Sequence, residues 1–114
     1  MSKFVKLALS TGEPAGIGPE VSLAAAKAFV AAHSGVEISL FGDRQLFAHE
    51  TLPPQIQISH TPLKNPPQFG VLDLDNAQYV LSVIRAASES CRVGQHHALI
   101  TAPVQKSILD TPQS

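Results

Sequence analysis

Hydrophobic and polar positions follow two different periods along this chain, and the period changes several times. Apolar residues at positions 4–10 form a short run that is typical of a buried strand. An alanine-rich stretch at 21–32 predicts a helix, with Pro19 in its first turn. Because this stretch is apolar on more than one side, we expect it to be buried between layers. Gly35 separates it from positions 36–41, whose alternation predicts a second strand.

The middle of the chain predicts only short elements. Asp43 is a plausible N-cap for a short helix over 44–49. The stretch 50–70 holds five of the nine prolines, which excludes a long helix and predicts a proline-rich loop region. Within it, positions 55–59 alternate with period two, and we expect an edge strand there.

The most regular helical pattern follows Asp73, which we expect to cap it. Its apolar face has spacings of three and four and consists of Ala77, Val80, Leu81, Ile84, Ala87 and Cys91. Gly94 is expected to end this helix, positions 97–101 predict a further strand, and 102–106 resemble another helix start. Alternating strands and helices predict an α/β fold with a mostly parallel sheet and helices on both faces. We treat residues 1–114 as one α/β segment.

Composition narrows the class of protein. The chain has 114 residues, 44% hydrophobic and 15% charged, with a formal net charge of -1. Its lysines and arginines are scattered, so we expect no nucleic-acid partner. No apolar run approaches the roughly 20 residues that span a bilayer, and Ser10, Glu13 and Pro14 interrupt the only signal-like stretch. We therefore expect no membrane association and a cytoplasmic protein. The single cysteine, Cys91, excludes an internal disulfide and is interpreted as a small core residue.

Candidate chemistry gathers at the carboxyl edge of the predicted sheet, where open parallel sheets bind ligands. Two turns leave strands there and enter helices, and both offer free backbone N–H groups to a phosphate or carboxylate. The candidate ligand-loop residues are Gly12, Glu13, Gly16, Gly18, Thr101 and Lys106. The glycine spacing fits neither the dinucleotide fingerprint nor the phosphate loop, and a turn that only packs a helix on a strand has the same pattern.

Two of these residues have open alternatives. Glu13 either orients a ligand or water, or bonds the N–H groups of its own turn. Lys106 either contacts a phosphate or carboxylate, or is a solvated lysine or part of an inter-subunit salt bridge. No metal site and no catalytic residue is assigned to this chain. His96 and His97 are adjacent, and neighbours on a strand point to opposite faces.

The ten residues of 11–20, TGEPAGIGPE, form a specific signature. They resemble the N-terminal signature of the 4-hydroxythreonine-4-phosphate dehydrogenase (PdxA) family, and their last five are similar to the opening loop of isocitrate and isopropylmalate dehydrogenases. Three later stretches fit the same family in order: 70–80, Cys91 with Gly94, and 98–106. The resemblance implies a partial isocitrate/isopropylmalate dehydrogenase-like fold.

The resemblance also implies an NAD-dependent oxidation and decarboxylation of a phosphorylated hydroxy-amino acid in pyridoxal phosphate (vitamin B6) biosynthesis. It implies a divalent metal, Zn²⁺, Mg²⁺ or Co²⁺, that polarises the substrate hydroxyl. It implies a homodimer of two-domain subunits acting on a small phosphorylated substrate.

This chain departs from the family in length. It is well under half as long, and the family's metal histidines and phosphate ligands lie beyond the matching stretches, so none is carried onto a residue here. We therefore expect an incomplete N-terminal part of a longer two-domain enzyme, inactive by itself. Two alternatives remain: a non-catalytic truncated α/β domain, and a relative that oxidises a different diol or phosphorylated hydroxy acid.

Overall fold

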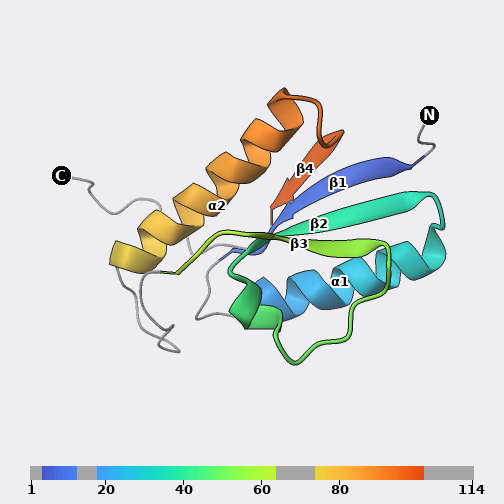
Figure 1. Ribbon diagram of the computed structural model, residues 1–114, viewed down its shortest axis with the longest axis horizontal. Helices are drawn as coiled ribbons and strands as arrows, with labels where there is room; N and C mark the ends of the chain where they lie inside the picture. The colour runs from blue at the N-terminus through green and yellow to red at the C-terminus, as the bar shows by residue number, and fades with distance from the viewer. Residues whose placement is uncertain (1–3, 13–17, 64–73, 102–114) are drawn as a thin grey trace.

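The computed structural model describes residues 4–12, 18–63 and 74–101. Strands and helices alternate along these ranges, as the hydrophobic pattern predicted (Figure 1). The elements are β1 (Val5–Ser10), α1 (Gly18–Ala32), β2 (Val36–Gly42), the 3-10 helix η1 (Arg44–Phe47), β3 (Ile56–His60), α2 (Leu74–Arg92) and β4 (Ala98–Thr101). The predicted cap Asp73 and the predicted helix start at 102–106 lie outside the described residues.

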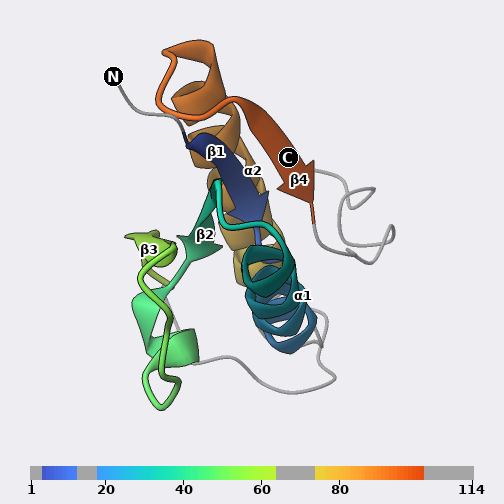
Figure 2. The ribbon, with the colours of Figure 1, turned by 90° about the vertical axis from the view of Figure 1, so that its right-hand side faces the viewer.

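The described strands form one sheet in the order β3-β2-β1-β4, and every neighbouring pair is parallel. Figure 2 shows β1 between β4 on one side and β2, then β3, on the other. The helices α1 and α2 lie on opposite faces of the sheet (Figure 1). The predicted α/β fold with a parallel sheet and helices on both faces is therefore confirmed, and β3 is the edge strand that the alternation at 55–59 predicted.

Each face of the sheet has its own hydrophobic core, because neighbouring strand residues point to opposite faces. On one face, Leu9 and Leu40 pack against the inner side of α1 through Leu23, Ala26 and Val30. The opposite face contributes two central strand residues to a cluster with α2: Ala8, Phe41, Tyr79, Val80, Val83 and Ala87. The sheet is thus the middle layer of three.

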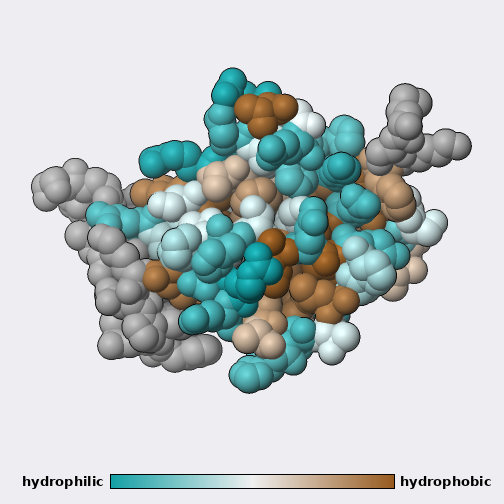
Figure 3. Space-filling view, in the orientation of Figure 1, coloured by the Kyte–Doolittle hydropathy of each residue, from teal (hydrophilic) through white to brown (hydrophobic). Residues whose placement is uncertain are grey.

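The expectation that α1 is buried between layers is wrong. Its outer side is exposed, with Val21 and Phe29 each 42% accessible. The residues between them on that side are small alanines, which leave little apolar area in water, so contact with the sheet along one stripe is sufficient to hold the helix. Figure 3 shows apolar patches among hydrophilic residues on the molecular face viewed in Figure 1.

The buried side of α2 also differs from the prediction. Ala77, Val80 and Ala87 are buried, as expected, whereas the predicted face members Leu81, Ile84 and Cys91 are only half-buried. Tyr79, Val83 and Ser90 are buried along with the first group. The helix is therefore rotated so that its stripe at 79, 83, 87 and 90 faces the sheet, a shift that the 3.6-residue period alone does not distinguish.

Two local predictions are confirmed by the backbone. The Asp43 side chain caps η1 by accepting from the backbone N–H of Gln45 at 2.9 Å, although the helix is a short 3-10 turn. Gly94 ends α2 with a positive φ of 87°, a conformation that glycine adopts without a steric penalty.

Candidate functional site

The carboxyl ends of the parallel strands meet at one edge of the sheet, here called the carboxyl edge. Ser10 at the end of β1 is paired in register with Thr101 at the end of β4. On its other side, Ser10 is paired with Phe41, one residue before β2 ends. The ends of β1 and β4 therefore lie side by side, which is the arrangement on which the predicted ligand loops depend.

The described ligand-loop candidates lie around this edge. Gly12 is buried and has a positive φ of 78°, so the chain turns sharply directly after β1. Gly18 is buried and begins α1, and Thr101 is exposed. Glu13, Gly16 and Lys106 lie outside the described residues. The structure thus brings Gly12 and Thr101 to one edge, and the ligand role of these residues remains a prediction.

Thr11 anchors the start of the glycine turn to the neighbouring strand. Its backbone N–H donates to the carbonyl oxygen of Phe41 at 3.2 Å, and its hydroxyl donates to the same oxygen at 3.0 Å. Thr11 is fully buried. The last residue before Gly12 is therefore held by two bonds to β2, which fixes the point where the turn leaves the sheet.

Asp43 holds the loop after β2 and the chain after β3. Its carboxylate accepts from the backbone N–H groups of Gln45 at 2.9 Å and Leu63 at 2.7 Å. The Nδ1 atom of His60 lies 3.9 Å from the same carboxylate, and it accepts from the N–H of Arg44 at 3.0 Å. Because both carboxylate oxygens accept from backbone N–H groups, Asp43 has a structural role: it connects the loop after β2 to the chain after β3.

Tyr79 connects α2 to Asp43. Its hydroxyl oxygen accepts from the backbone N–H of Asp43 at 2.7 Å. Burial, partly offset by the hydrogen bond from the Asp43 backbone, raises the pKa of Tyr79 to about 12, with the Asp43 charge adding to the rise and a side-chain hydrogen bond with Thr11 opposing it. The phenol therefore stays neutral at ordinary pH and serves as a hydrogen-bonding group in the core.

Gly42 allows these groups to come together. A Cβ atom at this position would lie 2.5 Å from the Thr11 hydroxyl and 3.0 Å from the Tyr79 hydroxyl. The sequence-based interpretation missed Thr11, Gly42 and Tyr79 as a cluster. The signal was present in two parts: a glycine at the end of a strand before an N-cap aspartate, and the single tyrosine of the chain on a helix face.

The described residues do not fit a metal centre. Within the ranges 4–12, 18–63 and 74–101, no three His, Cys, Asp or Glu side chains are arranged to hold a metal ion. His96 and His97 have different partners: His96 bonds to Ser39 and Ser90, whereas Nδ1 of His97 accepts from the backbone N–H of Lys6 at 2.9 Å. The metal that the family resemblance implies thus has no ligand set in this part of the chain.

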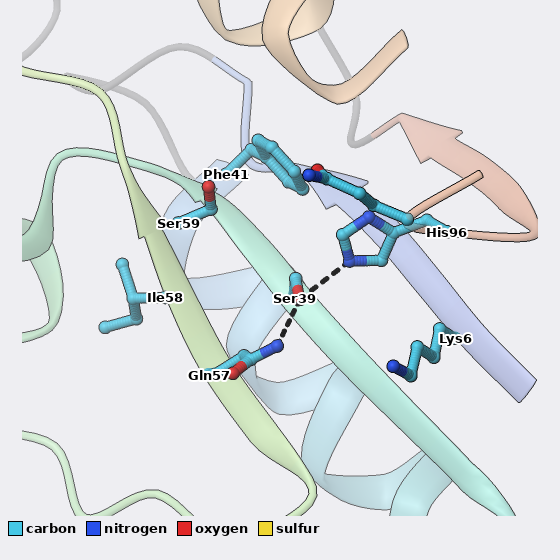
Figure 4. Close-up of a pocket in the computed structure, with 8 residues that line it drawn as sticks. Lys6, Ser39, Phe41, Gln57, Ile58, Ser59 and His96 are labelled. Atoms are coloured by element: carbon cyan, nitrogen blue, oxygen red, sulfur yellow. Dashed lines mark hydrogen bonds between the residues drawn. The ribbon is translucent and has the colours of Figure 1, made fainter. Parts of the chain in front are cut away.

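A second group of polar side chains lines a hollow on the α2 face of the sheet. We call it the polar hollow, and its polar side chains include Lys6, Ser39, Gln57 and His96. Figure 4 shows these four side chains on the same side of the sheet, with Ser39 between Gln57 and His96.

Among the helices that the structure describes, none is long and apolar enough to cross a membrane.

Fold and carboxyl edge together define a parallel α/β domain of the kind that binds ligands beyond its strand ends. The family model described as pyridoxal phosphate biosynthetic protein PdxA matches residues 16–113, so this chain belongs to the PdxA family. The match extends over most of the chain and confirms the family resemblance read from the signature at 11–20.

Named relatives agree with this assignment. The chain is 30% identical over 116 residues to a 4-hydroxythreonine-4-phosphate dehydrogenase of Burkholderia vietnamiensis, covering 93% of this chain and 35% of the relative. It is 35% identical over 127 residues to the enzyme of that name from Pseudomonas syringae pv. tomato, covering 92% of this chain and 37% of the relative. This chain therefore spans a little over a third of the length of these relatives.

Solved structures show the same fold. A 4-hydroxythreonine-4-phosphate dehydrogenase from Klebsiella pneumoniae superposes with a TM-score of 0.73 at 22% identity, covering 92% of this chain and 39% of that one. The corresponding enzyme from Burkholderia phymatum gives a TM-score of 0.71 at 22% identity, covering 93% and 38%. The described elements are thus part of the isocitrate dehydrogenase-like fold of these enzymes, as predicted.

Proposed function

We propose that this chain is part of an NAD-dependent 4-hydroxythreonine-4-phosphate dehydrogenase of pyridoxal phosphate biosynthesis. The reaction oxidises and then decarboxylates a phosphorylated hydroxy-amino acid. The observation that carries this proposal is the match of the PdxA family model to residues 16–113, together with relatives at 30–35% identity that bear the enzyme's name. Because the chain spans little more than a third of these relatives, we propose that it is inactive by itself.

Within this function, we assign the carboxyl edge to an anionic group of a ligand. The candidate residues are Gly12, Glu13, Gly16, Gly18, Thr101 and Lys106. The pairing of Ser10 with Thr101 supports this role, since it aligns the ends of β1 and β4. The exposed Thr101 hydroxyl and the N-terminal N–H groups of α1 are suitable donors for a phosphate or carboxylate.

We further propose that the complete enzyme uses NAD and a divalent metal, acts as a homodimer and is cytoplasmic. When bound, the metal supplies Lewis-acid polarisation of the substrate hydroxyl. We propose that its ligands lie outside the part of this chain that the structure describes, in which no three His, Cys, Asp or Glu side chains are grouped to hold an ion. Besides the proposed ligand contacts of Gly12, Gly18 and Thr101, the described residues build the sheet and hold Thr11 and Gly12 in place at its edge.

A direct assay tests the prediction for the chain alone. The purified chain is mixed with NAD, the phosphorylated hydroxy-threonine substrate and Zn²⁺, Mg²⁺ or Co²⁺ in turn, and NADH formation is followed by absorbance. We expect no turnover with any metal. Substrate-dependent NADH formation by the chain alone would show that it is a complete catalyst.

A chimera tests the assignment to the dehydrogenase. Residues 4–101 replace the matched segment of the Klebsiella pneumoniae enzyme, whose backbone follows the same fold. We expect NADH formation by the chimera, and an increase of about tenfold in KM for the phosphorylated substrate in its Thr101→Val variant, the loss of one hydrogen bond to a charged group. Ser88→Ala, on an exposed part of α2, is the matched control. A chimera with native secondary structure and no activity would contradict the assignment and favour a non-catalytic domain.

A further inference from the structure

The α2 face of the sheet is apolar on one half and polar on the other. In β2 and β3, residues that point toward α1 are apolar, including Ile38, Leu40 and Ile56. The alternate residues of these strands, which point toward the α2 face, are Glu37, Ser39, Phe41, Gln57 and Ser59. Of these, only Phe41 belongs to the hydrophobic core formed with α2. Polar residues at alternate positions are typical of a sheet surface that faces water. This half of the face is therefore suited to a polar occupant.

The polar hollow lies on this half and has a volume of about 400 Å³. Lys6 comes from β1, Ser39 from β2, Gln57 from β3, and His96 from the segment between α2 and β4 (Figure 4). Side chains from three neighbouring strands and from the segment before β4 thus line the same hollow. A hollow of this size holds a small molecule.

A chain of hydrogen bonds fixes one wall of the hollow. Nε2 of Gln57 donates to Oγ of Ser39 at 3.0 Å, and Oγ of Ser39 lies 2.9 Å from Nε2 of His96. On the other side of the ring, Nδ1 lies 3.0 Å from Oγ of Ser90, which in turn donates to the carbonyl oxygen of Ala87 at 2.6 Å. Phe41 packs edge-on against the ring at 5.6 Å between centroids.

The direction of these bonds follows from the donors available. Because the Ser90 hydroxyl hydrogen goes to Ala87, Nδ1 of His96 has to donate to Ser90. Nε2 then accepts from the Ser39 hydroxyl, whose oxygen is left to accept from Gln57. This assignment requires a neutral ring. Partial burial, with the charges of Lys6 and His97 adding to it, lowers the pKa of His96, in agreement with that protonation state.

Lys6 supplies positive charge to this wall. Glu37 of β2 lies opposite Lys6 in the strand pairing, but it does not line the hollow. The described residues include no ion pair between Lys6 and Glu37 within 4.0 Å. Among the described residues, no partner is assigned to the ammonium group of Lys6 or to the second amide hydrogen of Gln57, whose first amide hydrogen is bonded to Ser39. The Gln57 amide is already held in place by Ser39, so it needs little reorganisation to bind an anion.

We propose that the polar hollow is a binding site for a small oxyanion, the phosphate or carboxylate group of a small molecule, held by Lys6 and Gln57. Its two anion-binding residues lie away from the carboxyl edge, although the lining of the hollow extends to Phe41 and Ser59 near the ends of β2 and β3. Lys6 is the second residue of β1, and His96 precedes β4, so both lie toward the amino ends of their strands, whereas Thr11 and Thr101 lie at the opposite ends. The proposal is thus independent of the dehydrogenase function and of its ligand loops.

Titration of the purified chain with inorganic phosphate and, separately, with acetate tests the site. Ionic strength is held constant with sodium chloride, and NMR follows the His96 ring and the amides of 38–41 and 57–59. We expect saturable shifts confined to these groups. Saturation by phosphate alone assigns the site to phosphate groups, by acetate alone to carboxylates, and by both to either. The absence of saturable shifts with both anions would overturn the proposal.

Lysine variants separate a specific site from general charge attraction. Lys6→Met is expected to weaken binding by about tenfold or more, the loss of one hydrogen bond to a charged partner. Lys27→Met is the matched control, because Lys27 lies on α1, which packs on the other face of the sheet. An equal loss in both variants, or no loss in Lys6→Met, would overturn the proposal. Gln57→Leu, at an exposed edge-strand position, provides a second variant with the same expected direction.

Discussion

The hydroxyl oxygen of Tyr79 accepts a hydrogen bond from the backbone N–H of Asp43 at 2.7 Å, although the two residues are 36 positions apart. Tyr79 is only 5% accessible and Asp43 only 6%, so water does not replace the bond. This contact ties α2 to the loop after β2, and through Asp43 to the chain after β3. Three segments at the carboxyl edge thus depend on one buried phenol.

Removing that hydroxyl should destabilise the chain. In Tyr79→Phe the ring is kept, while the buried N–H of Asp43 loses its acceptor, and we expect the free energy of unfolding to fall by about 1–3 kcal/mol. Urea denaturation followed by circular dichroism measures this difference. Val93→Ala, at a side chain that is 52% accessible, is the control and should change little. Equal stability of Tyr79→Phe and the unsubstituted chain would contradict the structural role of the bond.

Gly42 should not tolerate a side chain. In Gly42→Ala the new methyl group would meet the Thr11 hydroxyl at 2.5 Å and the Tyr79 hydroxyl at 3.0 Å, and we expect a loss of about 1–3 kcal/mol. Gly35→Ala is the matched control, because no atom lies within 4 Å of the position that its Cβ would occupy and its φ is not positive. Chemical denaturation of both variants checks the contrast. If both substitutions had the same effect, crowding at Gly42 would not be the cause.

The titration of Tyr79 can be observed directly, because it is the only tyrosine in the chain. We expect its ultraviolet absorbance to change with a midpoint near pH 12 in the folded chain, against 10.0 for an ordinary tyrosine. Since the folded state keeps the proton that the unfolded state loses, stability should be full below pH 10 and should fall as the pH rises toward 12. A midpoint at 10 under folding conditions would show that the phenol is not buried as described.

His96 should make stability depend on pH in the opposite direction. Partial burial lowers its pKa, and Lys6 and His97 lower it further, so the unfolded chain binds a proton before the folded chain does. Stability is expected to fall as the pH decreases below 6.5, the ordinary pKa of histidine, through the lowered folded value. Urea midpoints of the unsubstituted chain and of His96→Gln, measured at several pH values, test this. An unchanged slope in the variant would exclude His96 as the source.

The exposed apolar side chains predict self-association. Val21 and Phe29 on α1 are each 42% accessible, and Ile100 on the edge strand β4 is 45% accessible. Large apolar side chains exposed on a helix surface and on an edge strand promote association. We expect concentration-dependent oligomers in sedimentation velocity runs, and less of them in Phe29→Lys, which introduces a charge on the outer side of α1. A monodisperse monomer at all concentrations would contradict this expectation.

Much of the fold could be predicted from local pattern. The apolar run at 4–10, the alternation at 55–59 and the glycine stop at Gly94 correspond to β1, β3 and the end of α2. The cap at Asp43 also follows from residue type, since a short carboxylate bonds the N–H groups that follow it. These features depend on neighbours within a few residues, which the sequence displays directly. The family assignment likewise rests on a contiguous signature.

Long-range pairings could not be predicted in the same way. The bond from Asp43 to Tyr79 joins residues 36 positions apart, and the contact of Ser39 with His96 joins residues 57 apart. Both depend on strand register and on the rotation of α2 about its axis, and helical periodicity does not determine that rotation. The exposed outer side of α1 is another example, because periodicity does not state how many layers surround a helix.

The amino-acid pattern alone was sufficient to establish the succession of strands and helices and the turn-forming glycines, because these follow from short-range sterics and periodicity. The family followed from the resemblance of the signature at 11–20. Which groups share a site depends instead on the folded chain. Parallel pairing of β1 with β2 and β4 brought Thr11, Phe41 and Thr101 to one edge, and the pairing of β1, β2 and β3 set Lys6, Ser39 and Gln57 across one face. Side-chain proximity across a sheet is fixed by register, a relationship between strands that no single strand contains.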